Sequence, residues 1–238
     1  MNDVLVIIPT YNEKDNIKKL IDKLLKLYDN IDILVIDDLS PDNTYKIVNK
    51  YYKNYKRVNL IVNANKMGLG RAYIIGYKWA IEKGYKYIIQ MDADFSHNPY
   101  DLEKFLSLIS QEKSDLIIGS RYIKNDIDWN LFRLFLSKIG NLFFKFMVDL
   151  NISDVTSGYK AIKIEKLKRI DLDSIISKGF SFQIEINYLF YKKDYIIKEV
   201  PISFINRENG KSKMNLSIII EATYLVFFIK YKEIFNNE

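Results

Sequence analysis

The stretch YKYIIQMDADFSHNP (85–99) joins an apolar run to two aspartates and the only histidine of the chain. Four similar runs, most of them rich in Ile and Val, lie at 4–8, 32–36, 58–62 and 115–119. Runs without regular alternation of apolar and polar residues are typical of strands that are buried on both faces. They therefore predict a sheet that is covered by helices, with strands at 4–8, 32–36, 58–62, 85–91 and 115–119.

Segments with helical spacing of apolar residues separate these strands. We predict helices over 14–28, from about 42 to 54, from the glycine loop 65–72 to about 83, and from near Pro99. Strand and helix alternate, which indicates a mostly parallel central sheet and an α/β fold. The second half is less regular; there we predict helices over 129–148 and 180–192, strands over 158–164 and 196–204, and a final apolar helix.

Composition limits the kinds of site that the chain can build. The 238 residues are enough for one domain with a proper core. No cysteine and a single histidine exclude disulfides, thiolate metal sites and histidine-rich zinc sites. Any metal must therefore be held mainly by oxygen atoms, which favours Mg²⁺ or Mn²⁺. The net charge of +6 is compatible with an anionic partner, although a lysine-rich genome can produce the same excess.

Neither the start of the chain nor its apolar segments indicate membrane insertion. The first residues, MNDVLVIIPTYNE, have no basic leader and no long apolar run, so we expect no signal peptide. No window reaches the roughly 18–20 apolar residues that cross a bilayer, so we expect no transmembrane helix. Two segments, 132–148 and 216–229, are apolar but contain charges. We expect them to form amphipathic helices that lie on a membrane or on a partner.

Polar motifs follow each of the first five strands. Ligands of parallel sheets bind beyond the carboxyl ends of the strands, so these motifs should gather at one edge. They are PTYNE (9–13), DDLSPD (37–42), NKMGLG (65–70), DADFSH (92–97) and GSRY (119–122). This edge is where we expect the site.

Asp92 and Asp94 have the spacing of a carboxylate pair. Alternate side chains at the end of a strand point the same way, so both can face one ligand. Two nearby anions need a cation between them, and a hard divalent ion bridging to a diphosphate meets that need. The alternative for an isolated Asp-x-Asp is a turn that caps the next helix. The buried strand before it and the clusters around it favour the metal.

The motifs after the second and third strands allow two interpretations each. Asp37 and Asp38 can bind a nucleobase and ribose, or they can form an Asx-turn and cap with Ser40 or Asp42. Both can hold together. The glycines of NKMGLGRA (65–72) can bring backbone N–H groups close to a phosphate. The alternative for such a loop is a tight turn without a ligand.

Three basic groups complete the pattern. Arg121 follows the fifth strand. Arg133 and Ser137 lie four residues apart, on one row of a helix that is otherwise apolar, and can hold a phosphate beside lipid. The alternative is a buried helix with a salt-bridged arginine. The loop 206–213 carries Arg207 and Lys213 and can act as a lid over an anion, or it can be a solvated basic loop.

Taken together, these motifs resemble the polyprenyl-phosphate (dolichyl-phosphate) mannose synthases, which are inverting glycosyltransferases of the GT-A fold. The resemblance runs from about residue 4 to 215, and its late motifs, the R-x-x-x-S helix and the GKSK loop, are the most specific. The family usually has glycine where this chain has Leu39 and Asn43, so the turn after the second strand is expected to differ. The resemblance implies a catalytic domain over 1–215 and a helix over 216–238 that packs on it or on a membrane.

The resemblance also implies roles for individual positions. Asp92 and Asp94 match the metal ligands, and Asp94, Arg121 and Arg133 match catalytic positions. Arg121, Arg133 and Ser137 match residues near the acceptor phosphate. The positions matching the nucleotide-sugar site are Pro9, Tyr11, Glu13, Asp37, Asp38, Lys66, Gly68, Asp92, Ala93, Asp94, Arg207 and Lys213.

The implied reaction transfers mannose from GDP-mannose to a polyprenyl or dolichyl phosphate, with Mg²⁺ or Mn²⁺. A phosphate acceptor is already ionised near neutral pH, so no strong base is required. We then expect His97 to shape its loop or approach a phosphate. The alternatives are a UDP-glucose or other hexose donor, and a sugar-hydroxyl acceptor with Glu185 as base. We expect peripheral attachment at the cytoplasmic face of a membrane, and no nucleic acid partner.

Overall fold

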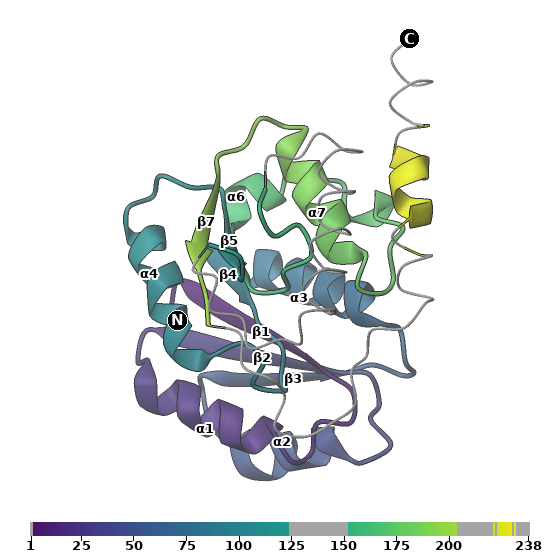
Figure 1. Cartoon of the computed structure of the whole chain (residues 1–238). Helices are drawn as coiled ribbons and strands as arrows, with labels where there is room; N and C mark the ends of the chain where they lie inside the picture. The colour runs from purple at the N-terminus through teal and green to yellow at the C-terminus, as the bar shows by residue number, and fades with distance from the viewer. Residues whose placement is uncertain (1, 124–151, 204–220, 222, 230, 232–238) are drawn as a thin grey trace.

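The computed structural model describes residues 2–123, 152–203, 221, 223–229 and 231 (Figure 1). Its centre is a seven-stranded sheet in the order β3-β2-β1-β4-β6-β5-β7. The strands are β1 (Val4–Thr10), β2 (Ile31–Asp37), β3 (Val58–Val62), β4 (Tyr87–Gln90), β5 (Leu116–Ser120), β6 (Lys160–Lys163) and β7 (Ile197–Pro201). Only β6 among them runs antiparallel, between β4 and β5. The predicted α/β fold with a mostly parallel sheet is confirmed.

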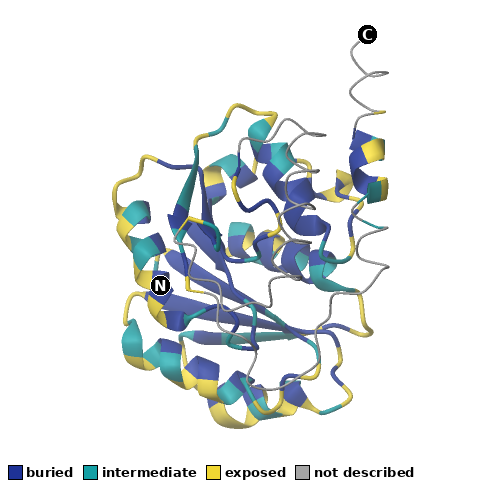
Figure 2. Cartoon of the chain, viewed as in Figure 1, coloured by how far each residue is buried: buried dark blue, intermediate teal, exposed yellow. Residues whose placement is uncertain are grey.

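Helices cover both faces of the sheet (Figures 1 and 2). One face carries α1 (Ile17–Leu27), α2 (Thr44–Tyr52) and α4 (Leu102–Ser110), which follows the short η1 (Pro99–Asp101). The other face carries α3 (Leu69–Lys83), α6 (Ile164–Leu167), η2 (Leu172–Ser174) and α7 (Phe182–Tyr191). The predicted strand and helix segments match these elements to within a few residues. The helix expected over 129–148 lies outside the described residues, as does most of the final helix.

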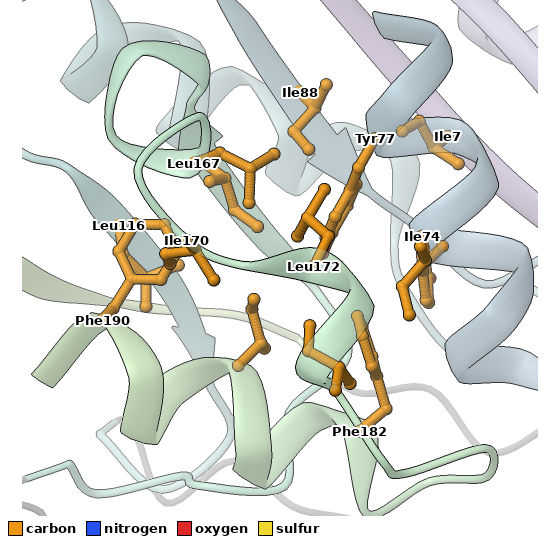
Figure 3. Close-up of a cluster of buried hydrophobic side chains, with 14 of the residues drawn as sticks. Ile7, Ile74, Tyr77, Ile88, Leu116, Leu167, Ile170, Leu172, Phe182 and Phe190 are labelled. Atoms are coloured by element: carbon orange, nitrogen blue, oxygen red, sulfur yellow. The ribbon is translucent and has the colours of Figure 1, made fainter. Parts of the chain in front are cut away.

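Alternate residues of the strands enter two separate cores. Leu5 and Ile7 of β1 contact the layer of α3 and α7, whereas Val6 and Ile8 contact the layer of α1, α2 and α4. Figure 3 shows the first core, where Phe182 lies among side chains that come from several elements. Side chains of a strand alternate between its two faces. A strand whose side chains are buried in a core on each face must therefore be apolar throughout. This accounts for the unbroken apolar runs in the sequence.

The carboxyl ends of β1, β2, β3, β4 and β5 lie at one edge of the sheet, because all five strands are parallel to one another. Residues 223–229 form a helix whose Leu225, Val226 and Ile229 are buried in the core of α3 and α7. Tyr224 and Phe227 of the same helix are exposed. Within the described ranges, no helix has the length and apolar character needed to cross a bilayer.

The turn after β2 keeps a glycine-like backbone without glycine. Leu39 has φ of 51° and Asn43 has φ of 65°, both in the left-handed region. Asparagine tolerates this region, but a leucine there is strained. Both positions therefore have a backbone conformation that glycine would adopt without strain.

Replacing Leu39 by glycine is expected to raise the free energy of unfolding by about 0.5–1 kcal/mol. Relief of about 1–2 kcal/mol of backbone strain exceeds the cost of about 0.5–1 kcal/mol for a more flexible unfolded chain. Leu39 is 46% exposed, so little packing is lost. Urea unfolding measures the change. Leu39→Ala keeps the Cβ atom and hence the strain, so an equal gain in that variant would show that strain is not the source.

Candidate active site

A cleft of about 200 Å³ opens at the predicted edge of the sheet. Its wall residues come from the ends of β1, β2 and β4, from the start of α3, and from the loop before α7. They are Pro9, Thr10, Tyr11, Glu13, Asp38, Lys66, Gly68, Leu69, Ala72, Asp92, Ala93, Asp94 and Phe180. Motifs after four of the five strands thus meet at one site, as the sequence predicts.

Asp92 and Asp94 lie on the wall of this cleft. The side chain of Asp92 is 25% exposed, while Asp94 is mostly buried. Asp94 Oδ1 accepts hydrogen bonds from the backbone N–H of Ser96 at 3.0 Å and from its hydroxyl at 2.6 Å. These bonds fix the orientation of the Asp94 carboxylate. The turn that Asp94 forms and the site on which it lies therefore coexist, and neither interpretation of the motif excludes the other.

His97 is a structural part of the aspartate loop. Its Nδ1 accepts a hydrogen bond from the backbone N–H of Asp92 at 3.0 Å, and its ring stacks on Tyr159 with centroids 4.8 Å apart. The neutral ring therefore carries its proton on Nε2, which lies 4.0 Å from Asp92 Oδ2. Burial lowers the pKa of His97, against the opposing charges of Asp92 and Asp94. The structure thus gives His97 the loop-shaping role that was expected.

Asp38 holds the glycine loop in place. Its carboxylate accepts from Asn63 Nδ2 at 2.7 Å and from the backbone N–H groups of Met67 at 3.1 Å and Gly68 at 2.8 Å. Gly68 has φ of 93°, and a Cβ atom there would lie 2.7 Å from the carbonyl oxygen of Lys178. Gly70 N–H donates to that same oxygen at 2.9 Å. The two glycine N–H groups are used within the protein, which supports the tight-turn interpretation for them.

Asp37 does not reach the cleft. It is fully buried, and its carboxylate accepts from Thr10 Oγ1 and from both the N–H and the hydroxyl of Ser40, each at 2.7 Å. The nucleotide-sugar role expected for Asp37 is therefore wrong as a direct contact. Its physical role is the Asx-turn that positions Asp38. Asp37 thus forms the Asx-turn, whereas Asp38 lies on the cleft wall.

The mouth of the cleft carries a cation and an aromatic ring. Lys66 Nζ lies 3.9 Å from the centroid of the Tyr11 ring, within the range of a cation–π contact. Glu13 begins the loop into α1, where its carbonyl oxygen accepts from the N–H groups of Asn16 and Ile17. Its carboxylate accepts from Asn16 Nδ2 at 2.9 Å. Lys66 thus adds a positive charge to the same cleft wall that carries Asp92 and Asp94.

Arg121 lies outside the cleft wall and is held by a residue that sequence reasoning missed. Its Nε and Nη2 donate to the two carboxylate oxygens of Asp154, at 2.7 and 2.6 Å. Burial lowers the pKa of Arg121, but the charge and hydrogen bonds of Asp154 outweigh it and raise the pKa above its usual value. The guanidinium is therefore charged at every working pH. Asp154 precedes TSGY (156–159), the only sequence signal that could have drawn attention to it.

Glu185 is unavailable as a base for a sugar hydroxyl. Its two carboxylate oxygens accept from the backbone N–H groups of Ile176 at 3.1 Å and Ser177 at 2.9 Å. Glu185 is mostly buried, on α7, and does not form part of the cleft wall. It fixes the loop that leads to Lys178 and Phe180. Glu185, the base that we considered for a hydroxyl acceptor, thus has a structural role instead.

Replacing Glu185 by glutamine is expected to lower the free energy of unfolding by about 1–3 kcal/mol, because an amide cannot accept both backbone N–H groups. The activity of the folded protein should stay within about twofold of wild type, since the residue does not form part of the cleft wall. Urea unfolding and transfer assays measure the two quantities. Glu165→Gln, at an exposed position, is the control. A large fall in turnover with no loss of stability would contradict the structural role.

Four expected site residues, Arg133, Ser137, Arg207 and Lys213, lie outside the described residues. Within the described ranges, no group of three or more His, Cys, Asp or Glu side chains could hold a metal ion. The carboxylates of Asp92 and Asp94 are the donors that the cleft offers. Mg²⁺ and Mn²⁺ suit such a site, because hard cations accept one or two carboxylates together with phosphate oxygens of a substrate.

The family profile and two related proteins that match this chain are all described as enzymes that transfer or attach sugars. The profile described as Glycosyl transferase family 2 matches residues 5–171. A polyprenol monophosphomannose synthase of Mycolicibacterium smegmatis is 39% identical over 225 residues, covering 93% of this chain and 84% of that protein. An undecaprenyl-phosphate mannosyltransferase of Micrococcus luteus is 39% identical over 221 residues, covering 92% and 90%.

Solved structures support the fold. Glucosyl-3-phosphoglycerate synthase from Mycobacterium tuberculosis, in complex with Mn²⁺ and UDP-glucose, superposes with a TM-score of 0.67 at 16% identity. The match covers 95% of this chain and 77% of that one. At this identity the likeness concerns the fold alone, and it confirms the expected GT-A architecture.

Proposed function

The chain belongs to glycosyl transferase family 2, and from this premise we propose that it transfers mannose from GDP-mannose to a polyprenyl phosphate, with inversion. The products are then polyprenyl phosphomannose and GDP. The two curated relatives, at 39% identity over more than nine-tenths of the chain, carry names that denote mannosyl transfer to lipid phosphates. Their coverage supports the same acceptor class here.

The observation that carries the acceptor class is the state of the candidate bases. Glu185 is occupied by two backbone N–H groups, and His97 Nδ1 accepts from the backbone of Asp92. A sugar hydroxyl must lose a proton during attack, whereas a phosphate monoester is already an anion near neutral pH. Because both Glu185 and His97 are engaged in hydrogen bonds with the backbone, the site suits an acceptor that needs no base, such as a phosphate.

The residues of the cleft have separate tasks in the proposed reaction. Asp92 and Asp94 would hold Mg²⁺ or Mn²⁺, and such an ion neutralises negative charge on the leaving nucleoside diphosphate. Lys66 forms part of the same wall and adds positive charge there. Arg121, fixed by Asp154, would orient the acceptor phosphate. Catalysis then consists of positioning and charge neutralisation rather than proton transfer.

Inversion follows from attack on the face opposite the leaving group. The donor diphosphate would lie against Asp92 and Asp94, and the acceptor phosphate against Arg121 on the other side of the sugar. An α-linked donor then gives a β-linked product. We further propose peripheral binding at the cytoplasmic face of a membrane, where a lipid acceptor presents its phosphate, with the exposed side chains of helix 223–229 nearest the lipid.

A panel of donors and acceptors tests the proposal. The protein is incubated with Mn²⁺ or Mg²⁺ and, in turn, labelled GDP-mannose, GDP-glucose, UDP-glucose or UDP-galactose. Each donor is offered to a short polyprenyl phosphate, the matching polyprenol and a mannoside. The proposal predicts transfer from GDP-mannose to the phosphate alone. Transfer to the mannoside or the polyprenol would contradict the acceptor class, and a preference for another donor would contradict the donor.

A further inference from the structure

The loop before α7, residues 176–180, contributes an aromatic side to the cleft, and other parts of the fold determine where this wall loop lies. Phe180, its last residue, forms part of the cleft wall. Glu185 accepts from two backbone N–H groups at the start of the loop, four residues before Phe180. In the middle, the carbonyl oxygen of Lys178 accepts from Gly70 N–H at 2.9 Å. These contacts leave the end of the loop, next to Phe180, to a third partner.

That third partner comes from the C-terminal part of the chain. Glu221 Oε1 accepts a hydrogen bond from the backbone N–H of Gly179, the residue directly before Phe180, at 3.0 Å. A hydrogen bond to a carboxylate is shorter and stronger than one between neutral groups. Glu221 lies beyond residues 5–171, which the family profile matches. A residue outside the family profile is therefore attached to a loop of the candidate active site.

The same contact explains why residue 179 is a glycine. A Cβ atom built on Gly179 would lie 2.5 Å from Glu221 Oε2, closer than real Cβ contacts. The backbone of Gly179 is not in the left-handed region, so its conformation does not require glycine. The Glu221 carboxylate thus lies directly against the backbone that it binds, in the space that a side chain at position 179 would need.

The helix that follows Glu221 is anchored in the core. Glu221 itself has a helical backbone, and Leu225, Val226 and Ile229 of helix 223–229 are buried among side chains of α3 and α7 (Figure 1). A group carried by a packed element restricts the position of the segment that it binds. Glu221 can therefore transmit the position of this helix to Gly179, and through Gly179 to Phe180.

We propose that Glu221 is a positioning residue of the donor cleft, which fixes Phe180 as the aromatic wall against which the nucleotide sugar packs. Aromatic rings in such clefts pack on flat or apolar parts of a ligand, such as a base or a sugar ring. Glu221 is not a wall residue itself, so its effect on the donor passes through Phe180. This inference rests on the proposed glycosyl transfer and adds to it a contribution from the C-terminal helix.

Three single variants change the contact in different ways. Glu221→Ala removes the acceptor, whereas Glu221→Gln keeps an oxygen that can accept from the one N–H group involved. Gly179→Ala keeps the charge but displaces the carboxylate, which is the flexible end of its side chain. Phe180→Ala removes the ring, and the double variant Glu221→Ala, Phe180→Ala completes a cycle.

The matched control is Asp115→Ala. Asp115 also accepts from a backbone N–H group of a loop, that of Ile196 at 2.9 Å, but it lies just before β5 begins and not at the carboxyl edge of the sheet. Its replacement removes the same kind of bond without touching the cleft. It should lower stability and leave the affinity for nucleotide sugar unchanged, which separates loss of a loop contact in general from loss of this one.

Calorimetry with Mn²⁺ measures the affinity of each variant for GDP-mannose. Glu221→Ala, Gly179→Ala and Phe180→Ala should each bind about 10-fold more weakly, the size of one aromatic packing contact. Glu221→Gln should stay within about threefold of wild type, because it can keep the hydrogen bond. The double variant should match Phe180→Ala to within about twofold, since a residue that acts through the ring has no effect once the ring is gone.

Two results would overturn the inference. If the losses from Glu221→Ala and Phe180→Ala multiply, to about 100-fold in the double variant, Glu221 does not act through Phe180. If Glu221→Ala binds GDP-mannose as wild type does, it is no positioning residue. Binding to wild type is measured separately and shows a failure of the proposed donor. If the donor panel selects another nucleotide hexose, the same cycle is run with that compound.

Discussion

Replacing Asp94 by asparagine is expected to lower kcat/KM for sugar transfer by about 100- to 1,000-fold while the fold is kept. Asparagine retains an oxygen that can accept from the Ser96 N–H and hydroxyl, so the local turn survives. What is lost is a negative charge beside Asp92, and with it the affinity that we propose for a divalent ion. Initial rates over a Mn²⁺ titration should therefore show a higher metal requirement as well as a lower maximum.

The control for this variant is Asp171→Asn. Asp171 accepts from the backbone N–H of Asp173 at 3.1 Å in a turn of the same kind, but it does not form part of the cleft wall. Its replacement should leave the rate and the metal titration unchanged. If Asp94→Asn turned over at the wild-type rate with the wild-type metal dependence, the metal assignment to this carboxylate pair would be wrong.

Replacing Asp154 by alanine is expected to lower the free energy of unfolding by about 3–5 kcal/mol, because it leaves the Arg121 charge buried without its partner. Asp154 is fully buried and the side chain of Arg121 is 13% exposed. The double variant Arg121→Leu, Asp154→Leu removes both charges and should regain most of the loss, since an apolar pair of similar volume is often as stable. Urea unfolding of both variants measures the difference.

The same double variant separates stability from function. It should be folded and bind GDP-mannose with nearly wild-type affinity, yet its KM for polyprenyl phosphate should rise by at least about 10-fold, because a charge-assisted contact to the phosphate is gone. A folded double variant with wild-type acceptor kinetics would show that Arg121 is a structural cation only.

The sheet and its ligand edge could be predicted because they follow from local patterns. Strands that are buried on both faces of a sheet must be apolar on both faces. Ligands of a parallel sheet bind beyond the carboxyl ends of its strands. The antiparallel insertion of β6 between β4 and β5 has no such signal. Its short run KAIK (160–163) indicates a strand, but its partners come from segments far away in the sequence.

Individual roles at the site were harder to predict. Asp37 and Asp38 are neighbours with the same side chain. Their roles differ because the hydroxyl groups of Thr10 and Ser40 donate hydrogen bonds to the carboxylate of Asp37. Asp154 forms an ion pair with Arg121, which lies 33 residues away in the sequence. Lys160 donates a hydrogen bond to Gln183, which lies 23 residues away. Sequence periodicity describes one element at a time, so pairings of this kind become visible only when the fold brings the partners together.

The measurement that tests the central claim most directly is the identity of the lipid product formed from GDP-mannose and a polyprenyl phosphate. The account predicts a mannosyl phosphodiester in the β configuration by proton and phosphorus NMR, formed with Mn²⁺ or Mg²⁺ and absent when EDTA is present. An α-linked product, a glycoside without phosphate at the linkage, or an equal yield in EDTA would each contradict it.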